Sequence, residues 1–290
     1  MKHIFKNYKT FLLAASVTAV ACTSNAEAQQ RIQIEITNNA ASSDGVVLTP
    51  LWTGFHDGSF NTFNRGAAAS AGLESIAEDG AVGTLSAEFN AAVTGGVDAN
   101  INGGLATASP AGPPPIQPGE TESSLFDLAT DGSNNFLSFA SMVLITNDFF
   151  IGSASAIDIS SVLSGGGPIS IEVSSVYDAG TEVEDFAFSA ANGAPFFDLG
   201  GGQTGPNQSG PTADTGLVSL VPSTGDPFAA FTNAALIGPD GVPAGFNFND
   251  AALYRDGIAT ITISAVAVPE PTSLTALLAM GTCGLLRRRR

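Results

Sequence analysis

Cysteine and lysine are scarce in this chain of 290 residues, and their positions limit its chemistry. The two cysteines, Cys22 and Cys283, lie near the two ends, so the stretch between residues 29 and 266 has none. That stretch can form no disulfide, no cysteine-ligated zinc site and no thiol nucleophile. It also has no lysine, and its only Lys or Arg residues are Arg31, Arg65 and Arg255.

Acidic residues greatly outnumber these three arginines. Residues 29–266 hold 25 aspartates and glutamates, and the whole chain has a formal net charge of −17. Such a surface repels phosphates and anionic lipid headgroups, which excludes nucleic acid as a partner. The carboxylates suit hard divalent cations, because calcium takes oxygen ligands. The alternative is that the charge only keeps an exported protein soluble.

Residues 1–28 have the layout of a secretory signal peptide. Three lysines precede an apolar stretch over residues 11–21, and small residues lead to a cleavage position after Ala28. Cys22 leaves a lipoprotein alternative open, although Ala19 stands where a larger aliphatic residue is preferred. We therefore expect the protein to be exported.

Residues 267–290 combine a Pro-Glu-Pro motif (Pro269, Glu270, Pro271), an apolar run over residues 274–286 and four terminal arginines. The run of about 13 residues would be roughly 20 Å long as a helix, too short for a stable bilayer span. The arginines would stay on the cytoplasmic side. The segment resembles the PEP-CTERM sorting signal. That resemblance implies transient insertion in the inner membrane, processing by an exosortase and delivery to the cell surface or extracellular matrix, with an ordinary tail anchor as the alternative.

The residues between the two ends show mainly β-strand patterns. Alternating or continuous apolar runs predict strands at 31–37, 46–52, 136–146, 149–151, 169–177 and 258–266. Only residues 66–78 have the pattern of a short amphipathic helix, and loops rich in Gly or Pro are expected at 90–118, 164–167 and 190–245. Together these patterns predict one all-β domain over residues 29–266, an antiparallel sandwich with one short helix.

Three blocks of this domain carry a family resemblance. The first includes Leu-Trp-Thr-Gly-Phe-His-Asp-Gly at residues 51–58, the second Asn-Asp-Phe-Phe-Ile-Gly at 147–152, and the third Tyr-Asp-Ala-Gly-Thr at 177–181. In this order they resemble the N-terminal domain of spondins in its bacterial form. The resemblance implies an eight-stranded, C2-like β-sandwich with a divalent cation, calcium, at one end. It also implies an adhesive or matrix-binding role, with extracellular polysaccharide or surface glycans as partners.

The same resemblance suggests which residues hold the cation. An aspartate before an aromatic pair falls on Asp148, and the Tyr-Asp-Ala-Gly block supplies Asp178. The third ligand maps to Asp127, with Glu122 as the fallback, and an aspartate there reaches less far than the family's glutamate. A cation would relieve the repulsion among clustered carboxylates. The alternative is that Asp148 and Asp178 are turn residues that accept hydrogen bonds from the backbone.

His56 is the only histidine outside the signal segment. A catalytic interpretation would pair it with a serine and with Asp57, but neighbouring residues of an extended segment point in opposite directions. No Gly-x-Ser-x-Gly motif accompanies it. We expect His56 to be a turn residue that packs against Trp52 or Phe55 and bonds to the backbone.

The aromatic residues around His56 allow two interpretations. Trp52, Phe55, Phe60 and Phe63 either stack on sugars or, as we expect, pack in the core. The sequence thus predicts a binding protein and no enzyme. Two alternatives remain open, an acidic structural component of the matrix without a specific ligand, and an extracellular hydrolase.

Overall fold

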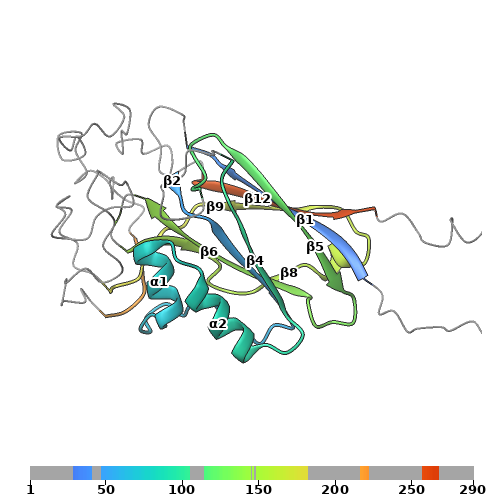
Figure 1. Cartoon of the computed structure of the whole chain (residues 1–290), viewed down its shortest axis with the longest axis horizontal. Helices are drawn as coiled ribbons and strands as arrows, with labels where there is room; N and C mark the ends of the chain where they lie inside the picture. Colours follow the sequence, from blue (N-terminus) through green and yellow to red (C-terminus); the bar gives the residue numbers. More distant parts are fainter. Residues whose placement is uncertain are drawn as a thin grey trace, which may run out of the picture.

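The computed structural model describes residues 29–40, 47–104, 114–144, 146, 148–181, 216–221 and 257–267. Within these ranges the chain forms two antiparallel β-sheets that pack as a sandwich (Figure 1), which confirms the predicted fold class. The predicted signal segment with Ala28 and Cys22, and the C-terminal segment with Pro269, Glu270 and Pro271, lie outside the described residues.

The smaller sheet has four strands. Their order is β5 (Thr121–Ala129), β1 (Gln29–Asn38), β12 (Ala259–Val266) and β9 (Ile169–Val173). Alternate residues of β1 are isoleucines, so one face of the strand is apolar and buried while the other is polar. The register with β12 places Ile263 opposite Ile34, which aligns the apolar faces of both strands.

The larger sheet is organised around β6. Its order is β11 (Ser219–Leu220), β10 (Tyr177–Asp178), β7 (Phe149–Gly152), β6 (Phe136–Leu144), β3 (Leu51–His56) and β4 (Val97–Ile101), and β2 (Val47–Leu48) and β8 (Ile157–Asp158) also pair with β6. Eight strands of the described residues have four or more residues, and the other four have two each. The C2-like topology that the resemblance implies stays a prediction.

Two predicted strands are each divided in the structure. The expected strand at 46–52 becomes β2 and β3, separated at Pro50, which has no backbone N–H to continue a strand ladder. The expected strand at 169–177 becomes β9 and β10, which belong to different sheets. The strands predicted at 31–37, 136–146, 149–151 and 258–266 correspond to β1, β6, β7 and β12.

The described residues include three helices where one was predicted. α1 (Ala71–Asp79) lies within the expected region, while α2 (Gly83–Ala92) and the short α3 (Ser160–Leu163) were not foreseen. The expected loop at 90–118 is also wrong in part, because it contains the end of α2 and the whole of β4. Val97, Ala99 and Ile101 of β4 pack against the main core.

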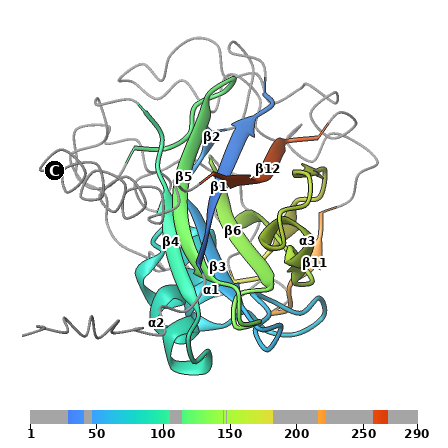
Figure 2. The same ribbon diagram turned by 90° about the vertical axis from the view of Figure 1, so that its right-hand side faces the viewer.

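The two sheets differ in how their outer faces are covered. α1 and α2 lie against strands of the larger sheet (Figure 2), so every residue of β3 is buried. On β3, Phe55 joins the core between the sheets while Trp52 joins a second cluster under the helices. The four-stranded sheet instead keeps the alternation of buried and partly exposed residues along β1 and β12.

Candidate functional site

The backbone brings Asp148 and Asp178 together although 29 other residues separate them in sequence. β7 and β10 are antiparallel neighbours, with Asp178 opposite Phe149, and the Ala179 amide donates to the Asp148 carbonyl oxygen at 3.2 Å. Both aspartates are buried. The two positions that the resemblance assigned to cation binding therefore lie side by side, Asp178 in β10 and Asp148 directly before β7.

Both carboxylates accept hydrogen bonds from the same short turn. The Gly180 amide donates to Asp178 Oδ1 at 2.6 Å, and the Thr181 amide donates to Asp148 Oδ2 at 3.0 Å. Since successive amide nitrogens are at most about 4 Å apart, these two oxygens lie within about 10 Å of each other. The contacts are those expected of turn residues, and the left-handed conformation of Gly180 (φ 68°) allows this turn.

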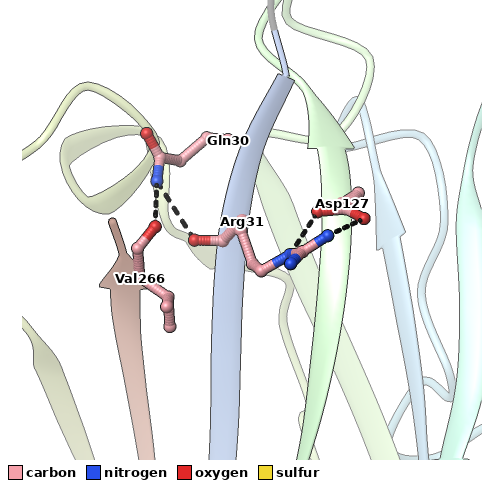
Figure 3. Close-up of polar contacts among 4 residues, drawn as sticks. All are labelled: Gln30, Arg31, Asp127 and Val266. Atoms are coloured by element: carbon pink, nitrogen blue, oxygen red, sulfur yellow. Dashed lines mark hydrogen bonds and ion pairs between the residues drawn. The ribbon is translucent and has the colours of Figure 1, made fainter. Parts of the chain in front are cut away.

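Asp127 is not part of this arrangement. It lies on β5 directly opposite Arg31, whose Nε and Nη2 donate to its two carboxylate oxygens at 2.7 Å each (Figure 3). The bonds from Arg31 hold the pKa of the Asp127 carboxyl below its usual range. Sequence reasoning did not foresee this pairing, although it follows from the register of β1 and β5.

The course of the chain also separates Asp127 from Asp148. Asp127 precedes the turn into β6, whereas Asp148 follows the far end of that nine-residue strand. A strand of this length spans about 30 Å. These positions give no support to a shared ion among Asp127, Asp148 and Asp178, which stays a prediction.

The fallback ligand, Glu122, has neighbours of its own. It lies near the start of β5, and burial together with the adjacent Glu120 raises the pKa of its carboxyl. Within the described ranges, no three His, Cys, Asp or Glu side chains form a group that could hold a metal ion. Of the predicted ligands, Asp148 and Asp178 are the two that the chain brings close together.

His56 is held in a buried position that suits packing better than catalysis. Its Nδ1 accepts a hydrogen bond from the Gly58 amide at 3.0 Å, so its Nε2 carries the proton and faces Ser138 Oγ at 3.0 Å. In this tautomer the ring donates to the serine and cannot take its proton. Burial lowers the pKa of His56, and the carboxylate of Asp57 instead accepts a bond from the Ser59 amide.

The aromatic residues near His56 form packing clusters. Trp52, Phe55 and Phe63 are buried, and Phe60 packs against the cluster under the helices. Ring centroids of Trp52 and Phe89 are 5.5 Å apart with the rings nearly perpendicular, a favourable edge-to-face contact. The expectation of core packing is confirmed for the three buried rings. His56 contacts Phe60, Phe89 and Phe136, which were not the expected partners.

A pair of acidic residues at the end of α1 is less exposed than the solvated helix end that the sequence predicts. Glu78 is buried and Asp79 is half-buried, and α1 has no basic residue in its last turn. Burial and the charge of Glu78 raise the pKa of Asp79 to about 6. Two carboxylates at the negative end of a helix are unfavourable. The sequence indicates this pair only through the adjacency of the two acidic residues.

The comparisons give no family assignment: no protein-family model and no curated protein matches the chain. Within the described part of the structure, no helix is long and apolar enough to cross a bilayer.

Proposed function

We propose that this chain is an exported protein that binds at the cell surface or in the extracellular matrix and performs no chemistry of its own. The observation that supports this most is that Asp178 in β10 lies beside Asp148, directly before the neighbouring strand β7, where the spondin-like motifs would place a functional end of the sandwich. The signal-like N-terminus and the Pro-Glu-Pro tail provide the route to the surface.

The state of His56 supports a binding role over a hydrolase. A serine nucleophile needs a histidine nitrogen free to accept its proton. Here Nδ1 accepts from the Gly58 amide, so Nε2, which faces Ser138, carries the proton. Ser138 is fully buried, so a substrate would not reach its hydroxyl without a rearrangement of β6. Chromogenic esters and polysaccharides incubated with the protein should therefore show no turnover.

Localisation tests the proposal directly. The full-length chain would be expressed in a bacterium that has an exosortase and makes an exopolysaccharide matrix, and its distribution would be followed by fractionation. We expect it in the surface and matrix fractions. A variant with Pro269→Ala and Pro271→Ala should accumulate in the membrane fraction instead. Recovery of the unaltered chain in the cytoplasm would contradict the proposal.

We also propose that a divalent cation, Ca²⁺, binds beside Asp148 and Asp178. Calcium needs six to eight oxygens, so main-chain carbonyls and the Thr181 hydroxyl, 3.4 Å from Asp148 Oδ2, would have to supplement the two carboxylates. Calorimetric titration with CaCl₂ should give a binding isotherm that Asp148→Asn and Asp178→Asn each abolish. Asp127→Asn should leave it unchanged, since Asp127 pairs with Arg31. No heat with the unaltered chain would remove the cation from the proposal.

The acidity of the chain favours a second candidate, a structural matrix component without a specific ligand. Residues 29–266 hold 25 acidic residues and three arginines, and the arginine at position 31 is engaged by Asp127. A glycan array separates the two candidates. A specific binder gives discrete hits, whereas a bulk component gives none.

A further inference from the structure

The outer face of the four-stranded sheet has an unusual composition. Its outward residues are mostly hydroxyl- or amide-bearing, in register across the strands: Gln33, Glu35 and Thr37 on β1, Thr121, Ser123, Leu125 and Asp127 on β5, Thr260, Thr262 and Ser264 on β12, and Ser170 and Glu172 on β9. No aromatic residue and no lysine lies among them. The face therefore presents many neutral groups that both donate and accept hydrogen bonds.

These groups are arranged in rows that cross all four strands. One row runs through Ser123, Glu35, Thr262 and Ser170, as the pairings of β5, β1, β12 and β9 show. Directly opposite residues share a face, and neighbouring strands are about 4.8 Å apart. A second row, Thr121, Thr37, Thr260 and Glu172, lies two residues further along. The face is thus a regular array of polar groups on a rigid backbone.

Cross-strand hydrogen bonds hold several of these side chains in place. Thr37 Oγ1 and Thr121 Oγ1 are 2.8 Å apart, and Gln33 Nε2 donates to Ser123 Oγ at 3.1 Å. A side chain that is already ordered loses little entropy when a ligand binds. The array is therefore preorganised for contact with another regular polar surface.

The face is accessible within the described structure. The outward residues of the edge strands are exposed, and Leu125 has 59% of its surface exposed. α1 and α2 pack on the other sheet (Figures 1 and 2). The sandwich thus has one sheet covered by helices and one that those two helices leave open.

Charge determines which kind of polymer this face can accept. Arg31 and Asp127 neutralise each other, which leaves Glu35 and Glu172 on a face of otherwise neutral groups. The whole chain has a net charge of −17, which disfavours the approach of a polyanion. A neutral polymer feels no such repulsion, and its hydroxyls can donate to the two glutamates while exchanging hydrogen bonds with the threonines.

We propose that the outer face of β5, β1, β12 and β9 binds an extended neutral polysaccharide laid across the strands. The inference rests on the proposed matrix-binding function and assigns a surface and a ligand class to it. Recognition is by many hydrogen bonds to a hydroxyl array, without aromatic stacking.

The experiment measures retention of the full-length chain on an array of neutral linear glucans, mannans and galactans, with alginate as the polyanion. The test variant is Thr37→Val/Thr260→Val/Thr262→Val, because valine keeps the shape and strand preference of threonine but removes its hydroxyl. Thr84→Val/Thr94→Val is the control, since both threonines are exposed and lie away from the four-stranded sheet, Thr84 in the first turn of α2 and Thr94 just after its end. We expect the unaltered chain to bind a neutral polymer and not alginate, and the test variant to bind about tenfold more weakly or not at all.

Each outcome bears on the proposal. Reduced binding of the test variant with unchanged binding of the control supports it, provided that circular dichroism shows the fold intact. Equal binding by all three proteins overturns the assignment of this face but leaves the matrix-binding function standing. Binding to alginate alone, or to no polymer while the chain still reaches the matrix fraction, overturns the ligand class. Failure to reach the surface or matrix at all refutes the proposed function itself.

Discussion

At the residue scale, Asp79 makes the stability of this protein depend on pH. Its folded pKa of about 6 exceeds the ordinary 3.8 because of burial and the neighbouring Glu78. The charged carboxylate is thus less favourable in the folded chain than in the unfolded one. Its penalty is present above pH 6 and disappears as the pH falls from 6 towards 4, so acidification stabilises the fold through this group.

Asp79→Asn should therefore stabilise the protein at pH 7 and have little effect at pH 4.5. The shift of about 2 pKa units corresponds to about 3 kcal/mol, which we reduce to about 1 kcal/mol because Asp79 is only half-buried. Urea unfolding at the two pH values measures the difference. Asp57→Asn is the control. Hydrogen bonds from Ser59 lower the pKa of the exposed Asp57, so its contribution to stability changes with pH only below the compared range of 4.5 to 7. A pH-independent effect of Asp79→Asn would contradict the assignment.

At the element scale, the start of α1 depends on a residue of α2. Glu88 accepts bonds from the Ser70 hydroxyl at 2.7 Å and from the Gly72 amide at 2.8 Å, while Ser70 Oγ accepts from the Leu73 amide. A carboxylate at this position also complements the positive end of the helix dipole. The contact thus joins the two helices that cover the larger sheet.

Glu88→Ala should cost about 1–2 kcal/mol of stability, because it leaves the Gly72 amide without its acceptor and loosens the cap. Glu88→Gln should recover part of this loss. Glu74→Ala, in the first turn of α1, removes the same charge without a bond to the cap and should change stability by less than about 0.5 kcal/mol. Chemical denaturation gives all three values, and equal losses at Glu88 and Glu74 would show that charge alone acts.

The pattern of buried residues explains why some strands and helices could be predicted from the sequence and others could not. β1 and β12 have one covered face, so isoleucine and polar residues alternate along them. β4 has the same alternation in Val97, Ala99 and Ile101, but its Gly- and Ala-rich surroundings gave it the composition of a loop. α2 has only two buried side chains, Leu85 and Phe89, and thus a weak helical pattern.

The candidate site was predictable only in part for a related reason. Asp148 and Asp178 sit in two of the short motifs that resemble spondin domains, and that resemblance associated them; the motifs include strands that pair. The partner of Asp127 depends on the register of β1 and β5, which are about 90 residues apart in the chain, and nothing local encodes it. Likewise, the ring contacts of His56 come from the packing of α2 and β6 against β3.

At the scale of the whole molecule, the net charge of −17 makes stability depend on salt. The compact fold brings like charges together, and screening reaches from about 30 Å at 0.01 M salt to about 10 Å at 0.1 M. The thermal midpoint of the full-length chain should therefore rise as NaCl increases from 0.01 to 0.15 M at pH 7.

Charge reversal at two exposed or partly exposed positions tests the cause. Glu35→Lys/Glu172→Lys moves the net charge from −17 to −13 and should make the dependence on NaCl less steep. Thr84→Val leaves the charge unchanged, so its midpoint should follow the same slope as that of the unaltered chain. An equal dependence of the thermal midpoint on NaCl in all three proteins would contradict the role of charge repulsion. Salt would then act through the hydrophobic core, which is the same in all three because they differ only at the surface.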